Sequence, residues 1–100
     1  MIVTLFRSRL APDVGDEYHA PAERMDQLAR TMPGYISHKT FTAEDGERVT
    51  IVEFESLDAV KVWRMNSERA EAQRLGRKRF CSEYKIQTCE VLRQNVFKRP

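Results

Sequence analysis

The segment that most constrains the fold is residues 43–47, which contain an Asp-Gly pair between two runs rich in β-formers, Tyr35–Thr42 and Arg48–Glu55. Asp-Gly is a strong hairpin signal, so the two runs are expected to pair as antiparallel neighbours. If the Asp-Gly pair is a two-residue loop, the register places His38 opposite Glu53. Apolar side chains fall on both faces of this hairpin, so each face needs a covering layer.

Strand-like and helix-like segments flank the hairpin on both sides. Ile2–Leu10 alternates as a strand does and is apolar on both faces at its start, and Ser82–Arg93 alternates again near the other end. Between Val14 and Met32, apolar residues recur at spacings of three and four, as in an amphipathic helix. Pro21 predicts either a kink near residues 17–21 or a helix whose regular part begins at Pro21.

Two helical runs follow the hairpin: Leu57–Met65, capped by Ser56, and a second run through Arg79, capped by Asn66 or Ser67. The order is therefore strand, helix, strand, strand, helix, strand. Two right-handed crossovers give an α+β, ferredoxin-like βαββαβ fold, with a four-stranded antiparallel sheet in the order 4-1-3-2 and helices on one face. The uncovered apolar face predicts a homodimer packed sheet to sheet. One domain is expected over residues 1–97, with residues 98–100 as a tail.

Charge and composition exclude several classes of function. Lys and Arg number 17 against 15 Asp and Glu, a net charge of +2, and no basic-aromatic RNA-binding motif surrounds the strand phenylalanines. The longest apolar run, Met1–Phe6, is far shorter than the roughly 20 residues of a membrane span and has no signal-peptide pattern. Cys81 and Cys89 have no companion ligands at metal spacing. We expect a cytoplasmic protein that binds no nucleic acid, membrane or metal.

Several segments together resemble the antibiotic biosynthesis monooxygenase (ABM) family. They are residues 32–37 (MPGYIS), residues 41–50 (FTAEDGERVT), and the run from Trp63 to Gln73 with the Leu75-Gly76-Arg77, Phe80, Glu83-Tyr84 and Ile86-Gln87 that follow it. The resemblance spans roughly Ile2 to Phe97. It implies a dimeric α/β barrel, in which the sheets of two subunits pack together and a ligand pocket lies between sheet and helices.

The resemblance also implies a kind of chemistry. Oxygenases of this family act without flavin or metal, so no cofactor is expected: an electron-rich phenol or quinol is deprotonated and its carbanion reacts with O₂, in a pocket that excludes water. Gln73 stands where heme-degrading members carry an iron-ligating histidine, so heme degradation is not expected. The interpretation is a cofactor-independent monooxygenase of a small aromatic or quinol-like compound. The alternative is a non-catalytic small-molecule-binding or stress-associated dimer.

Candidate site residues follow from this chemistry. His38, Glu53 and His19 are candidates for proton transfer, and the first two would face each other in the register given above. The candidates for contact with substrate are Trp63, Tyr18, Tyr84, Phe80 and Met25. Structural interpretations stand beside these roles, because a tryptophan packs well in a core or dimer interface and a His-Glu pair also forms across ordinary strands.

The second helical run carries a cluster of basic residues, Arg69, Arg74, Arg77, Lys78 and Arg79. Their composition is that of an anion-binding patch. On a helix, however, Arg74 and Lys78 share one face while Arg77 is turned aside. Glu68 and Glu71 lie close by, so we interpret the cluster as a solvated helix face.

Overall fold

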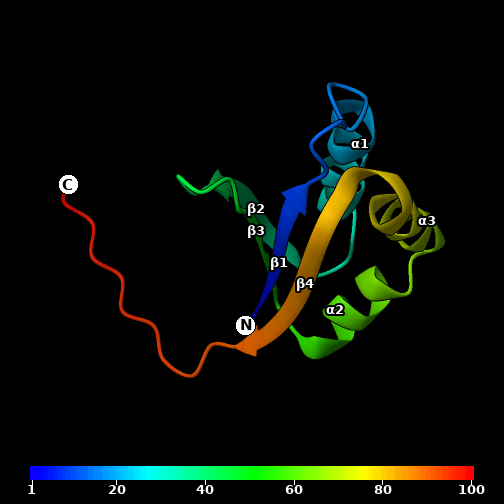
Figure 1. The fold of residues 1–100 in the computed structure, drawn as a ribbon. Helices are drawn as coiled ribbons and strands as arrows, with labels where there is room; N and C mark the ends of the chain where they lie inside the picture. The colour runs from blue at the N-terminus through cyan, green and yellow to red at the C-terminus, as the bar shows by residue number, and fades with distance from the viewer.

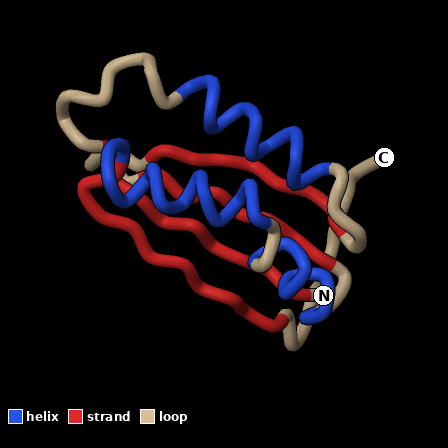
Figure 2. The backbone as a smooth tube through the Cα atoms, turned by 90° about the vertical axis from the view of Figure 1, so that its right-hand side faces the viewer, coloured by secondary structure: helices blue, strands red, loops and turns tan.

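The computed structural model describes residues 1–100 as one four-stranded antiparallel sheet with the helices on one of its faces (Figures 1 and 2). The elements in chain order are β1 (Ile2–Leu10), α1 (His19–Arg30), β2 (Tyr35–Thr42), β3 (Arg48–Phe54), α2 (Leu57–Arg64), α3 (Ser67–Leu75), the π-helical turn η1 (Gly76–Phe80) and β4 (Cys81–Glu90). The strand order is β2-β3-β1-β4, which is the predicted order read from the other edge. The ferredoxin-like fold is confirmed.

The register of the β2–β3 hairpin differs by one residue from the prediction. The Ala43 N–H donates to the Glu47 carbonyl, which leaves a three-residue loop whose Gly46 has a φ of 90°. Such a loop, with a glycine in the left-handed region, is the usual alternative to a two-residue turn. His38 consequently pairs with Val52, so the predicted pairing with Glu53 is wrong. Because side chains alternate along a strand, the shift places His38 and Glu53 on opposite faces of the sheet.

Helix α1 begins at His19, so Pro21 lies in its first turn. The first backbone N–H groups of a helix have no partner within it, so a proline is tolerated there. Of the two predictions, a kink near residues 17–21 or a regular helix from Pro21, the second is closer to the structure, in which the helix begins two residues before Pro21. Gly34, with a φ of 79°, follows the helix and leads the chain into β2.

The two shorter helices have the predicted side-chain caps. Ser56 Oγ accepts from the Ala59 N–H at 3.2 Å, and Asn66 Oδ1 accepts from the Arg69 N–H at 3.0 Å. The second helical run ends as the π-helical turn η1, and β4 ends at Glu90 rather than Arg93. Residues 91–100 have no regular structure and lead away from the sheet (Figure 1). None of the helices combines the length and apolar character that a membrane span needs.

The hydrophobic core lies between the sheet and helices α1 and α2. Its buried members are Ile2, Ala29, Val52, Phe54, Ala59, Val60 and Trp63. Phe54 is completely buried, and Tyr35 packs edge-on against it with ring centroids 6.4 Å apart. Three of these core residues, Ala29, Val52 and Trp63, also line a cavity between the sheet and the helices.

Candidate functional site

A cavity of about 240 Å³ lies between the sheet and the helices. Its floor consists of side chains from the helix-facing side of the strands: Thr4, Phe6, Ser8, Leu10, Thr50, Val52 and Ile86. Met25, Ala29 and Ala72 on α1 and α3 contribute apolar surface above this floor. More than half of the lining residues are hydrophobic, 13 of 24, which suits a cavity that binds an organic molecule.

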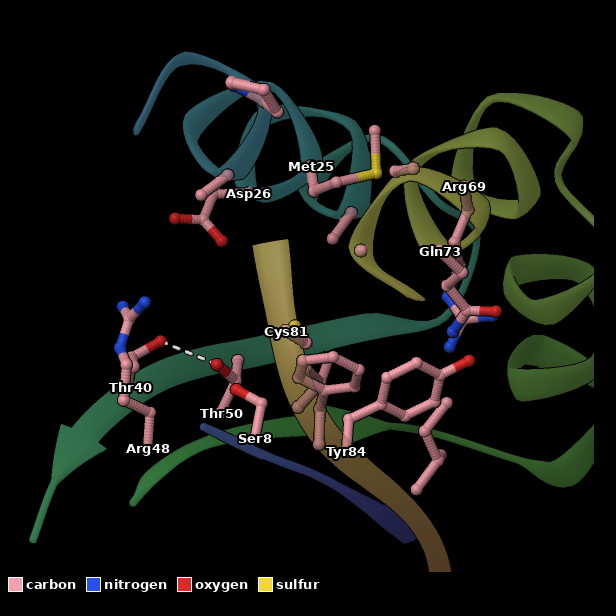
Figure 3. A pocket seen from close by; sticks show the side chains of 18 of the residues that line it. Ser8, Met25, Asp26, Thr40, Arg48, Thr50, Arg69, Gln73, Cys81 and Tyr84 are labelled. Carbon is pink, nitrogen blue, oxygen red and sulfur yellow. Dashed lines mark hydrogen bonds between the residues drawn. The ribbon is translucent and has the colours of Figure 1, made fainter. Parts of the chain in front are cut away.

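Polar side chains line the cavity on two opposite sides (Figure 3). On one side are Asp26 of α1 and His38 of β2, which we call the α1 wall. On the other side are Arg69 and Gln73 of α3 with Tyr84 of β4, which we call the α3 wall. The walls rise from opposite edges of the sheet, because β2 and β4 are its two outer strands.

His38 is the most enclosed polar group of the α1 wall, with its side chain only 8% exposed. Its Nδ1 lies 2.7 Å from the Tyr35 hydroxyl, and its Nε2 lies 3.4 Å from Oδ1 of Asp26. Tyr35 is part of the same strand, whereas Asp26 comes from the facing helix. The imidazole is therefore oriented by one strong hydrogen bond and lies beside a carboxylate that can stabilise its protonated form.

Arg69 dominates the α3 wall. Its guanidinium lies 5.2 Å from the ring centroid of Trp63, and it donates to the Gln73 amide oxygen at 3.0 and 3.3 Å in the amide orientation that satisfies both groups. Tyr84 completes the wall, and its hydroxyl accepts from Nη1 of Arg77 at 2.9 Å. Burial lowers the pKa of Arg69, because desolvation disfavours the charged form, and nearby Arg64 acts in the same direction.

Trp63 belongs to the hydrophobic core and to the cavity at once. It is 8% exposed, it is a member of the buried cluster, and it lines the cavity beside Arg69. The two interpretations given to this residue are thus compatible, since one edge of a large aromatic side chain can pack in a core while another borders a cavity.

The sequence-predicted site residues divide into two groups. All five proposed substrate contacts line the cavity, namely Trp63, Tyr18, Tyr84, Phe80 and Met25, and so does His38. His19 does not line it, and its side chain is 63% exposed beside Asp16. Glu53 lies on the other face of the sheet, where its carboxylate accepts from the Ser37 hydroxyl at 2.5 Å.

Sequence reasoning missed several residues of the site. Asp26 and Tyr35, which contact His38, were not singled out for any role, and Arg48, which lines the cavity near Tyr18, was not considered. Arg69 was interpreted as part of a solvated face, but it is half-buried and lines the cavity. Its position one turn from the capping Asn66 gave no signal of this. No group of three His, Cys, Asp or Glu side chains is arranged to hold a metal ion.

Comparison with known proteins gives a family match over most of the chain. Residues 1–75 match the family model described as antibiotic biosynthesis monooxygenase. The chain is also 32% identical over 80 residues to the uncharacterised protein YqjZ of Bacillus subtilis (strain 168), which corresponds to 80% of this chain and 70% of that protein.

Solved structures share the fold at low sequence identity. Rv0793 from Mycobacterium tuberculosis superposes with a TM-score of 0.82 at 17% identity, covering 95% of this chain and 98% of that one. SnoaB, a cofactor-independent oxygenase from Streptomyces nogalater, superposes with a TM-score of 0.80 at 14% identity, covering 97% of each chain. At such identities the likeness concerns the fold of the chain.

Proposed function

This chain belongs to the antibiotic biosynthesis monooxygenase family, and on that premise we propose that it is a cofactor-independent monooxygenase of a small phenol or quinol. The observation that carries the proposal is His38, a nearly buried imidazole at the edge of an apolar cavity, oriented by Tyr35 and adjacent to Asp26. The name of SnoaB, a cofactor-independent oxygenase with the same fold, supports the reaction class.

His38 acts in this proposal as the base that takes the phenolic proton. The Tyr35 hydroxyl can accept a hydrogen bond as well as donate one, so Nδ1–H of His38 can donate to it and leave the unprotonated Nε2, which lies beside Asp26, as the proton acceptor. The substrate O–H bond breaks and an Nε2–H bond forms. The resulting imidazolium lies 3.4 Å from Asp26, whose negative charge stabilises it.

The deprotonated ring then supplies all the electrons that O₂ requires. One oxygen atom forms a new C–O bond at a ring carbon, whose C–H bond breaks, and the other leaves as water with that proton and the proton returned by His38. For a hydroquinone, two of the four electrons come from hydroxylation of the ring carbon and two from oxidation of the hydroquinone to the quinone. The apolar lining contributes by excluding water from the anionic intermediate.

Oxygen uptake tests this proposal directly. The protein is incubated without oxygen with a panel of hydroquinones and anthrones, air is admitted, and O₂ consumption is compared with buffer. We expect substrate-dependent uptake that falls by about 10²–10⁴-fold in His38→Gln, because a positioned general base contributes that much. His19→Gln is the matched control and should retain full activity, since His19 lies outside the cavity.

Two results would speak against the proposal. Uptake no faster than in buffer for every compound would remove the oxygenase function, and the same uptake in His38→Gln would remove the role of His38. If ligands bind in the cavity but none reacts, the protein is a small-molecule-binding member of the family, which is the alternative function.

We further propose that the protein is a homodimer formed by packing of the helix-free faces of two sheets. That face carries the apolar side chains of Val3, Leu5, Phe41, Val49 and Ile51, which no helix of the same chain covers (Figure 2). Light scattering at micromolar concentration should give twice the chain mass of 11.7 kDa, and Ile51→Glu should give the single-chain mass. A wild-type mass of one chain would exclude this assembly.

A further inference from the structure

The guanidinium of Arg69 lines the cavity without a carboxylate partner. It contacts the Trp63 ring and the Gln73 amide, both of which are uncharged. The two acidic residues of its own helix pair elsewhere, Glu68 with Arg24 at 2.6 Å and Glu71 with Arg74 at 2.6 Å. The protein therefore places a charge at the cavity, while both carboxylates of the same helix form other ion pairs.

A half-buried cation of this kind is costly unless an anion approaches it. Desolvation is the main cause that lowers the pKa of Arg69, yet a guanidinium remains protonated at neutral pH. The neighbouring Arg64 lowers the pKa of Arg69 further, Tyr84 acts in the opposite direction, and no Asp or Glu forms an ion pair with Arg69. An anionic group of a ligand would supply the counter-charge that the fold does not provide.

The charge balance of the whole cavity points in the same direction. Its charged lining residues are Arg48, Arg69 and Asp26. If His38 is counted as neutral, the net charge of the lining is +1. Asp26 lies beside His38 on the α1 wall, on the side of the cavity opposite Arg69 (Figure 3). The α3 wall itself carries only positive and neutral groups.

The donors of the α3 wall suit a carboxylate. A guanidinium presents two parallel N–H groups that match the two carboxylate oxygens. The Tyr84 hydroxyl accepts from Arg77, so its own proton is available to donate to a ligand oxygen. A phosphate dianion carries more charge than one guanidinium can balance, and most of the cavity lining is apolar.

We propose that the α3 wall binds the carboxylate of an aromatic acid, so that the protein selects phenolic or quinol-like carboxylic acids over neutral phenols. The inference rests on the proposed function for the reaction of the ligand's aromatic ring, but binding of the carboxylate does not depend on that reaction. Strands β2 and β4 are three strand spacings of about 4.8 Å apart. With its carboxylate at Arg69, the ring of such a compound would lie over the apolar floor between the two walls.

Binding of a matched pair of probes tests this inference under anaerobic conditions. The probes are 2,5-dihydroxybenzoate and its neutral analogue 2,5-dihydroxybenzamide, which differ only in the group that would meet Arg69. Trp63 is the only tryptophan and lines the cavity, so its fluorescence reports occupancy, and calorimetry gives a second reading. We expect the wild type to bind the acid at least tenfold more tightly than the amide.

Three variants at two arginines of the same helix show which arginine causes the preference for the acid. Arg69→Gln should bind acid and amide equally, and Arg74→Gln, which removes an exposed arginine paired with Glu71, should retain the preference. Arg69→Lys, which keeps the charge but not the fork, should fall between them. Far-UV circular dichroism of each variant establishes that it is folded before binding is compared.

The outcomes separate this inference from the proposed function. Equal binding of acid and amide by the wild type, or an acid preference that persists in Arg69→Gln, would overturn the carboxylate site. If the acid preference depends on Arg69 but no compound consumes O₂, the carboxylate site stands and the oxygenase function falls. If O₂ is consumed with neutral phenols as readily as with acids, the oxygenase function stands and the selectivity for acids falls.

Discussion

Gly34→Ala is expected to destabilise the protein by about 2–5 kcal/mol, from two separate causes. Gly34 has a φ of 79°, and a side chain in the left-handed region costs about 1–2 kcal/mol. An added Cβ would also lie 2.6 Å from the Cβ of Ala59. Ala59 has no flexible side chain to move aside, so helix α2 itself must shift, and such overpacking costs about 1–3 kcal/mol.

Gly46→Ala provides the matched control for this substitution. Gly46 has a φ of 90°, but an added Cβ there meets nothing within 4 Å. It should therefore lose only the backbone cost of about 1–2 kcal/mol. The difference between the two variants isolates the contact between the turn before β2 and helix α2, which carries Trp63.

Urea unfolding followed by far-UV circular dichroism measures both variants, at one fixed protein concentration because the proposed dimer would make stability depend on concentration. Ala59→Gly should cost less stability when added to Gly34→Ala, where it removes the close contact, than when added to Gly46→Ala. Equal free energies of unfolding for Gly34→Ala and Gly46→Ala, within about 0.5 kcal/mol, would refute the packing argument. So would the absence of coupling between Gly34→Ala and Ala59→Gly.

Three further outcomes are expected. Trp63→Ala should lower the free energy of unfolding by about 3–5 kcal/mol, because Trp63 is 8% exposed in the core. Phe97→Ala, at an 80% exposed position in the tail, should change it by less than about 0.5 kcal/mol. Chemical denaturation measures the free energy of unfolding of both variants. The hydrogen bond from Arg9 holds the pKa of Asp45 below its ordinary value. The pair therefore stabilises the protein at pH values above the ordinary pKa, and this stability is lost as the pH falls through the lowered pKa. Urea unfolding at a series of pH values should show that Arg9→Gln loses less stability than the wild type on acidification to about pH 2. Tyr35→Phe should slow O₂ uptake by about tenfold with ligand binding unchanged, because it removes one hydrogen bond that orients the imidazole, and an unchanged rate would contradict that role.

The strands were predictable because their signals are local. The bounds of β1 and β2 agree with the alternation and turn residues read from the sequence. Ser56 caps α2 as predicted, and Asn66, one of the two predicted candidates, caps α3. The one error of register arose from the loop. An Asp-Gly pair is compatible with two-residue and three-residue turns, and the choice between them moved His38 from Glu53 to Val52.

The site was only partly predictable, because its contacts join distant parts of the chain. His38 was found as an isolated candidate, but its contact with Asp26 exists only because α1 packs over β2. Arg69 follows a capping residue in an ordinary helix, and helical spacing alone does not distinguish an arginine that faces solvent from one that faces a cavity. The family resemblance supplied part of the aromatic lining, since Trp63, Phe80 and Tyr84 lie within the segments that carry it.

The sequence by itself determined the element order, and through it the ferredoxin-like sheet and the family, because periodicity, caps and turn residues act over a few positions. Tertiary structure alone decided which polar groups meet at the cavity. One residue of register placed Glu53 behind the sheet, and the packing of α1 and α3 over it placed Asp26 beside His38 and left Arg69 without a carboxylate. Such juxtapositions depend on how layers are oriented, and the alternation of a strand or the turn of a helix specifies only one layer at a time.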